Sequence, residues 1–141
     1  MKVQKLLYGT AGIPLSTAVS LRMNIPMIYV RKSPKGYGTD SMVEGIFKKG
    51  SKVVLIDDMI TDGGSKMKFI DGLKKVGAKV KDIVVVLDRE EGGKESLSAY
   101  GVKLHSLVTL KDVLKFMKEN SLVQEDKYQE IIDYLAVQSN S

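Results

Sequence analysis

Two adjacent carboxylates and a glycine turn follow one apolar run of the chain. The segment "VVLIDDMITDGGSK" (53–66) places Asp57 and Asp58 directly after aliphatic residues, and Gly63 and Gly64 shortly afterwards. Paired glycines let the backbone turn tightly and approach a ligand closely. A helix that starts just after them would present free N–H groups and a positive dipole end to an anion. The pattern therefore predicts a phosphate-binding turn.

The two carboxylates must serve a different part of the ligand, because a carboxylate repels a phosphate. Ribose hydroxyls, a hydrated Mg²⁺, or both would suit Asp57 and Asp58, since hard cations prefer oxygen ligands. Simple capping of a strand end is the alternative, but it does not account for the glycine turn. The turn is not a Walker P-loop, because the lysine of "GGSK" follows the serine instead of preceding it. These residues predict Mg²⁺-assisted binding of a phosphorylated sugar.

Apolar runs alternate with helical patterns along the chain, and these elements must position the site. Continuous aliphatic strands that alternate with helices are typical of a parallel sheet covered on both faces. We therefore expect an α/β fold and, from the length of 141 residues, a single domain over 1–141. The expected strands are 5–8, 26–30, 52–56, 82–87 and 103–110, and the expected helices are 14–23, 65–77, 95–101, 110–120 and 125–137.

Polar and glycine-rich segments follow four of the predicted strands. In open parallel sheets, ligands bind outside the carboxyl ends of the strands. The segments are "GTAG" (9–12), the long polar stretch 31–45 that opens with two basic residues, the glycine turn described above, and "DREEGG" (88–93). A polar loop as long as 31–45 inside a compact domain is usually functional or disordered. The four strand ends together predict one ligand site.

Composition narrows the classes of function. The formal charge of +5, with 22 Lys and Arg, suits a polyanionic ligand, although a solvated lysine-rich surface explains most of these residues. The absence of cysteine excludes disulfides, zinc–thiolate sites and a cysteine nucleophile. No apolar run approaches the roughly 20 residues of a membrane span, and the start does not resemble a signal peptide. We expect a cytoplasmic protein without membrane or nucleic-acid partners, since aromatic residues do not alternate with basic ones.

Four segments carry a resemblance to a known family. The run "VVLIDDMITDGGS" resembles the phosphoribosyl pyrophosphate (PRPP) signature of the type I phosphoribosyltransferases. "GIPLSTAVS", "RKSPKGYGT" and "VVVLDREEGGKESLSAYGVKLHSLVTL" are similar to the orotate phosphoribosyltransferases, particularly the orotate domain of UMP synthase. The resemblance runs in order over residues 6–117. It implies a Rossmann-like parallel-sheet core and the transfer of phosphoribose from PRPP to orotate, which gives orotidine 5'-monophosphate and pyrophosphate in pyrimidine (UMP) biosynthesis.

The resemblance also implies roles at the predicted strand ends. Asp57 and Asp58 would contact the ribose hydroxyls, with Mg²⁺ held nearby through PRPP and water and without a direct protein ligand. The side chain of Asp62 would point away from the 5'-phosphate. The residues that would cradle this phosphate are Thr61, Asp62, Gly63, Gly64 and Ser65.

A mobile catalytic loop is the second implied feature. Lys35 would be the main catalytic cation, and the loop would be shared across a homodimer. Without the resemblance, the loop could be a solvated basic segment, and Arg89 could form a structural ion pair with Asp88 or Glu90. The resemblance implies that pyrophosphate is received by Thr10, Ala11 and Gly12. It implies a catalytic loop that contains Arg31, Lys32, Lys35 and Tyr37, whose basic residues meet pyrophosphate. It also implies that Arg89 binds orotate.

One part of the family pattern has no counterpart in this sequence. The orotate enzymes carry a hood segment before the pyrophosphate loop, whereas Met1 lies shortly before Gly9 here. We expect the hood to be missing and catalysis to be weaker than in a hooded homologue. Two other functions stay open at this point: a type I transferase for a purine or another base, and a non-catalytic PRPP-binding module.

Overall fold

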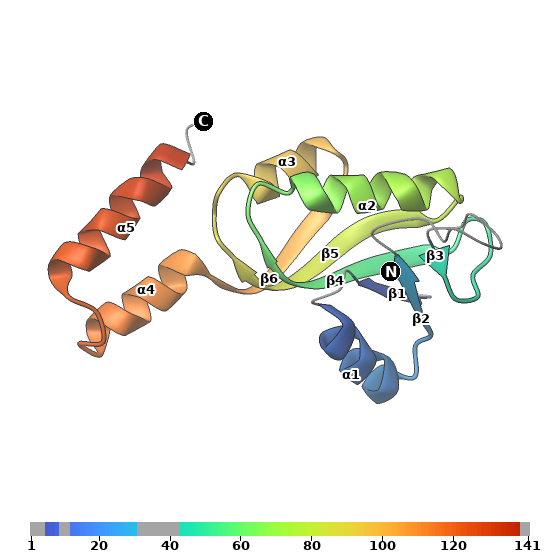
Figure 1. Ribbon diagram of the computed structural model, residues 1–141, viewed down its shortest axis with the longest axis horizontal. Helices are drawn as coiled ribbons and strands as arrows, with labels where there is room; N and C mark the ends of the chain where they lie inside the picture. The colour runs from blue at the N-terminus through green and yellow to red at the C-terminus, as the bar shows by residue number, and fades with distance from the viewer. Residues whose placement is uncertain (1–4, 9–11, 31–42, 139–141) are drawn as a thin grey trace, which may run out of the picture.

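The computed structural model describes residues 5–8, 12–30 and 43–138. Six strands form one sheet in the order β3-β2-β1-β4-β5-β6 (Figure 1). All neighbouring pairs are parallel except β2 with the two-residue edge strand β3. The strands are β1 (Lys5–Tyr8), β2 (Met27–Val30), β3 (Val43–Glu44), β4 (Lys52–Ile60), β5 (Lys79–Asp88) and β6 (Lys103–Thr109). The helices are α1 (Ile13–Met23), α2 (Gly64–Lys75), α3 (Gly93–Ala99), α4 (Leu110–Glu119) and α5 (Glu125–Gln138).

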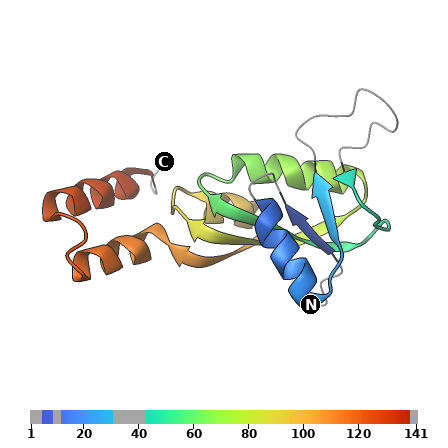
Figure 2. The ribbon, with the colours of Figure 1, turned by 60° about the horizontal axis from the view of Figure 1, so that its bottom comes forward.

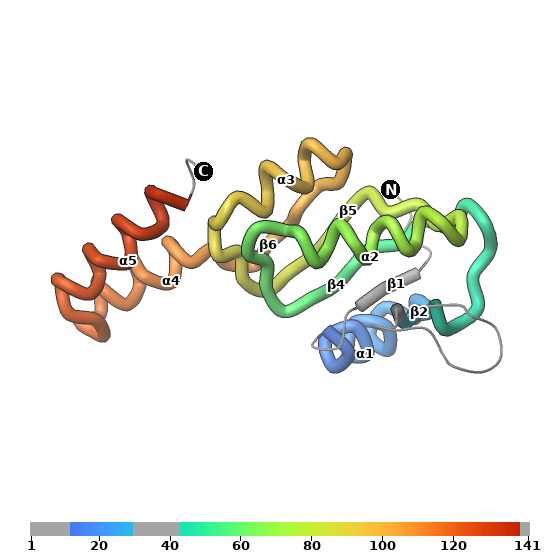
Figure 3. The backbone as a smooth tube through the Cα atoms, turned by 45° about the horizontal axis from the view of Figure 1, so that its top comes forward, coloured from blue at the N-terminus to red at the C-terminus, as the bar shows by residue number. Residues whose placement is uncertain are grey.

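Helices cover both faces of the sheet. Helices α2 and α3 lie on one face and α1 lies on the other (Figures 1 and 3). Helices α4 and α5 form a hairpin that extends away from the sheet at the carboxyl end of β6 (Figure 2). The predicted α/β parallel sheet is therefore confirmed. Among the described residues, no helix combines the length and the apolar character needed to cross a membrane.

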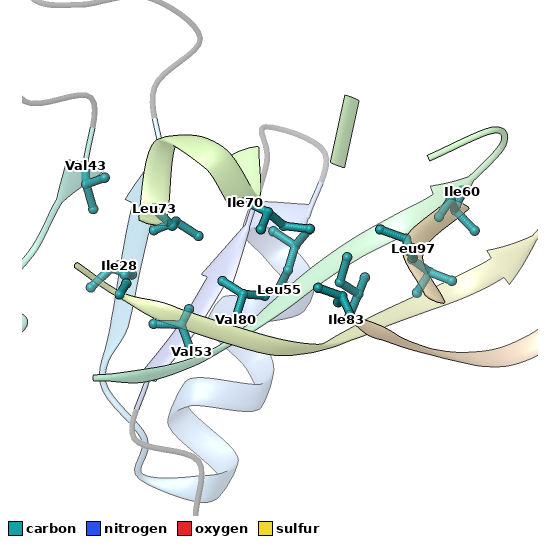
Figure 4. Packing of buried hydrophobic residues seen from close by; sticks show 13 residues of the cluster. Ile28, Val43, Val53, Leu55, Ile60, Ile70, Leu73, Val80, Ile83 and Leu97 are labelled. Carbon is teal, nitrogen blue, oxygen red and sulfur yellow. The ribbon is translucent and has the colours of Figure 1, made fainter. Parts of the chain in front are cut away.

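Strand β4 is buried on both faces, and its alternating side chains divide between two clusters. Val53 and Leu55 belong to the main core with Ile70 of α2 (Figure 4). Val54 and Ile56 belong to the smaller cluster beside α1. Successive side chains of a strand point to opposite faces, so Asp57 continues the side of Val53 and Leu55, whereas Ile60 departs from the alternation and returns to the main core.

The sequence-based bounds differ from the structure at several places, and β5 begins at Lys79 instead of residue 82. Strand β4 does not end at Ile56 but continues to Ile60, because its pairing with β5 runs on to the pair Ile60–Asp88. The short strand β3 was not predicted, and it pairs antiparallel with β2 directly after the segment 31–42. The predicted stop of α2 is confirmed, because Gly77 adopts a left-handed conformation with φ 81°.

Candidate functional site

The turn between β4 and α2 has the geometry that the glycine pair predicts. Gly63 is the N-cap of α2 and has φ 85°, a left-handed conformation that favours glycine. Its carbonyl accepts the Met67 N–H at 3.0 Å, so the helix starts at once. The first turn of α2 therefore directs its N–H groups toward the carboxyl end of β4. The predicted cradle residues 61–65 lie together in this turn.

Asp62 directs its side chain onto the start of α2. Its Oδ1 atom accepts the Gly64 N–H at 3.0 Å and lies 3.4 Å from the Thr61 hydroxyl, which donates to it. The side chain thus folds onto the start of α2, and its direction relative to a bound 5'-phosphate stays a prediction. The physical reason is that a carboxylate near a helix N-terminus satisfies a free N–H and interacts favourably with the helix dipole. One N–H of the cradle is therefore already bonded to an internal carboxylate.

The first of the two adjacent aspartates is buried and paired. Asp57 is 5% exposed, and its Oδ2 atom lies 2.5 Å from the ammonium of Lys66 in the first turn of α2. Its Oδ1 atom accepts the Asp58 N–H at 3.1 Å. Sequence reasoning did not include Lys66 in the site, although its place directly after the glycine–serine turn was a usable signal.

The second aspartate is more accessible. Asp58 is half-buried, its Oδ1 atom accepts the Met59 N–H at 2.8 Å, and it forms no ion pair with any described residue. By the alternation of β4 its side chain points to the face opposite Asp57. Its carboxylate is a hard oxygen donor that suits Mg²⁺ or its bound water. Within the described ranges, no three acidic or histidine side chains gather into a metal cluster, so any cation here would also need ligand or water oxygens.

A second strand-end turn, between β5 and α3, packs against the first. The Arg89 N–H donates to the Ile60 carbonyl at 3.0 Å. A Cβ atom added to Gly93 would lie 2.4 Å from the Thr61 carbonyl oxygen, so only glycine fits there. The two predicted strand-end segments are therefore in direct contact, and the β5 turn supports the cradle from one side.

Arg89 forms an ion pair, with a partner other than the two that the sequence suggested. Its Nη2 atom lies 2.6 Å from Oε1 of Glu91, and its side chain is 40% exposed. The neighbouring Asp88 is buried and accepts the Glu90 N–H at 2.8 Å. Burial raises the pKa of the Asp88 carboxyl above its ordinary value. A role of Arg89 in binding a base stays a prediction.

A cavity of about 320 Å³ lies between α3, β6 and the start of α4. Its lining mixes acidic, basic and hydroxyl side chains and does not include Arg89. The residues that line it are Asp88, Glu90, Gly92, Lys94, Glu95, Leu104, Ser106, Thr109 and Lys111.

Several predicted site residues lie outside the described residues, namely Thr10, Ala11, Arg31, Lys32, Lys35 and Tyr37. The structure therefore does not test the pyrophosphate loop or the catalytic loop. Gly12 is described: it is buried and is the N-cap of α1, and Pro14 lies in the first turn of that helix. The helix that follows "GTAG" starts as predicted.

The chain has relatives of known family. Residues 9–119 match the phosphoribosyl transferase domain family. The chain is 47% identical over 107 residues to an orotate phosphoribosyltransferase of Dinoroseobacter shibae, which covers 74% of this chain and 47% of the relative. Other curated relatives are covered over 57–65% of their length. The chain thus spans about half to two thirds of the relatives that it matches.

Solved structures show the same similarity. UMP synthase of Leishmania donovani superposes with a TM-score of 0.85 at 29% identity over 96% of this chain and 30% of that one. Orotate phosphoribosyltransferase of Aeropyrum pernix gives a TM-score of 0.73 at 36% identity over 87% of this chain and 68% of that one. From this match and from the strand–turn–helix site, the chain belongs to the phosphoribosyl transferase domain family, and within it is similar to the orotate phosphoribosyltransferases.

Proposed function

We propose that the protein transfers phosphoribose from PRPP to orotate, giving orotidine 5'-monophosphate and pyrophosphate in pyrimidine biosynthesis. The observation that carries the proposal is the β4–α2 turn, in which the left-handed Gly63 starts α2 close to two aspartates near the carboxyl end of β4. The names of the relatives support orotate as the base. A purine or another base would use the same sugar-phosphate site and is the second candidate.

The described residues would bind the sugar and its 5'-phosphate. The N–H groups of α2 beyond Gly64 would donate to phosphate oxygens, and Asp57 and Asp58 would accept from ribose hydroxyls. Breaking the bond between C1 and pyrophosphate builds positive charge on the ribose and negative charge on the leaving group. Mg²⁺, when bound, would neutralise part of the leaving-group charge.

The remaining roles belong to residues that the family resemblance selects. Arg31, Lys32 and Lys35 would stabilise the departing pyrophosphate, because cations placed where charge develops lower the barrier. Lys35 would contribute most, Tyr37 would contact the ligand from the same loop, and Arg89 would bind orotate. Pyrophosphate would also meet the loop formed by Thr10, Ala11 and Gly12.

The proposed assembly is a homodimer in the cytoplasm that shares the catalytic loop between subunits. A loop that closes over PRPP excludes water, which would otherwise hydrolyse it. A dimer predicts that two inactive variants with different lesions, one in the loop and one in the cradle, regain partial activity when mixed.

The test is the loss of orotate absorbance on addition of PRPP and Mg²⁺, with Lys35→Ala as the matched variant. Loss that disappears in Lys35→Ala and on chelation of Mg²⁺ supports the transferase. Activity with adenine or another base, but not with orotate, would instead support the second candidate. Calorimetric binding of PRPP without turnover of any base would identify a PRPP-binding module and contradict the proposed catalysis.

A further inference from the structure

Strand β6 forms one edge of the sheet, and no further described strand pairs with it there. It runs from Lys103 to Thr109, and its partner among the described residues is β5 alone. Helix α4 begins directly after it at Leu110 and leads away from the sheet (Figure 2). A strand at an edge presents a row of unpaired N–H and C=O groups. The outer side of β6 is therefore open to a further strand.

The two edges of the sheet differ in how they are protected. Natural sheets limit edge pairing with very short edge strands, or with proline and lysine on the edge. The opposite edge strand, β3, has only two residues. Strand β6 has seven residues and no proline, and its only lysine is the first of them. Leu107 is 72% exposed and Val108 is 39% exposed, so an apolar stretch is accessible at the longer, less protected edge.

The sequence of β6 is compatible with antiparallel pairing to a copy of itself. When a two-fold axis passes beside the central Ser106, all seven residues of one strand oppose the seven of the other. Like charges directly opposite each other destabilise antiparallel strands, and this register contains none. The opposed pairs are Leu104 with Val108, His105 with Leu107, Lys103 with Thr109, and Ser106 with its own copy.

The charges beside β6 favour the same antiparallel orientation. A hollow of about 330 Å³ near the start of β6 has three lysines and no acidic residue in its lining. The cavity of about 320 Å³ near the end of β6 has three acidic and two basic residues. The three lysines are Lys81, Lys94 and Lys103, and the three acidic residues are Asp88, Glu90 and Glu95. Antiparallel pairing places the start of one β6 beside the end of the other, so the basic end of each copy meets the more acidic end of its partner. Complementary charges fix the register of two partners.

We propose that β6 pairs antiparallel with β6 of a second copy of the chain, about a two-fold axis at Ser106, and joins the two sheets into one continuous sheet. Such a contact uses the same surface on both copies and closes on itself. It lies at the edge opposite β3, whereas the loop-sharing dimer proposed above involves the segment 31–42, which connects β2 to β3 in the chain. The two contacts are therefore separable, and the pairing of β6 does not depend on PRPP binding.

Cross-linking through one introduced cysteine tests the position of the axis. The chain has no cysteine, so Ser106→Cys places a single thiol at the axis, in an exposed position. Opposed Cβ atoms of antiparallel strands lie roughly 4.5–5.5 Å apart, within reach of a short bis-methanethiosulfonate reagent. Lys115→Cys is the matched control, because its thiol lies at an exposed position of α4. Ser106→Cys should give at least about tenfold more cross-linked dimer than this control, since pairing raises the effective concentration of the two thiols.

A charge placed on the edge tests the pairing itself. Leu107→Lys introduces a residue that natural sheets use to protect their edges. Because Leu107 is 72% exposed, the thermal midpoint of a single copy should stay unchanged. Leu122→Lys is the matched control, since Leu122 is 62% exposed and lies between α4 and α5. In sedimentation velocity over a series of concentrations, Leu107→Lys should weaken association roughly 10- to 100-fold, because the two-fold axis places the new charge in the interface twice. Leu122→Lys should associate as wild type does.

Two results would overturn the inference. One is Ser106→Cys that cross-links no more than Lys115→Cys under the same conditions. The other is Leu107→Lys that associates as strongly as wild type, because the association would then use a different surface. Neither assay contains PRPP or orotate, so a failure of the proposed transferase function would leave both results unchanged.

Discussion

Replacement of Gly93 by alanine is the sharpest test of how the β5–α3 turn supports the phosphate cradle. An added Cβ atom would lie 2.4 Å from the Thr61 carbonyl oxygen and 2.8 Å from Cγ1 of Ile60. Real Cβ contacts essentially never fall below 3.0 Å, and the Thr61 oxygen belongs to the backbone between β4 and α2. The two turns must therefore separate.

The expected cost follows from the size of this clash. Adding a methyl group to a well-packed interior typically costs about 1–3 kcal/mol. For a domain of this length, that corresponds to a fall of roughly 3–10 °C in the thermal midpoint. Because the displaced carbonyl lies in the turn that precedes α2, PRPP affinity should fall together with stability.

Gly72→Ala is the matched control. Gly72 lies inside α2, and a Cβ atom there would have nothing within 4 Å. Alanine is favoured over glycine in a helix interior by up to about 1 kcal/mol, so this variant should raise the thermal midpoint and leave PRPP affinity unchanged. The assays are thermal unfolding and calorimetric titration with PRPP. A Gly93→Ala variant that matches wild type in both assays would refute the proposed support of the cradle.

Two further substitutions test the charges of the site. Asp62→Asn keeps an acceptor for the Gly64 N–H but removes a negative charge from the cradle, so calorimetry should show about fivefold tighter PRPP binding, or ~1 kcal/mol; unchanged or weaker binding contradicts this. Burial raises the pKa of the Asp88 carboxyl above its ordinary value of 3.8. The folded protein therefore holds this proton more tightly than the unfolded chain, and stability falls as the pH rises from 3.8 through the raised pKa. Asp88→Asn should therefore have a higher thermal midpoint than wild type at neutral pH and an equal one in acid; a lower midpoint at neutral pH is the contrary result.

Much of the fold could be predicted because its signals are local. The aliphatic run 53–56 forms a buried strand, and the left-handed Gly63 directly precedes α2. Gly77, which is also left-handed, follows the end of α2. The end of β4 could not be found locally. Asp57 was treated as the residue that follows the strand, yet its charge is compensated by Lys66 and the ladder with β5 continues past it.

The orientations within the site were harder to predict than its location. The sequence places Asp57 and Asp58 side by side, but their different partners depend on which helix lies over each face of β4. The bond of the Asp62 carboxylate to the Gly64 N–H could not be predicted from the residue type, because it depends on where α2 begins. Contacts across elements, such as that of Gly93 with Thr61, have no signal in either segment alone.

The α4–α5 hairpin has a consequence for local unfolding. Helix α5 packs along α4 and away from the sheet (Figures 1 and 2). The two helices are joined by an ion pair of 2.6 Å between Lys118 of α4 and Glu125 of α5. The Lys118 ammonium also lies over the ring of Tyr128. Detachment of α5 therefore leaves the paired strands β4 and β5 intact. Amide hydrogens of α5 should exchange with solvent through a low-energy partial opening, while those of β4 should exchange only on global unfolding.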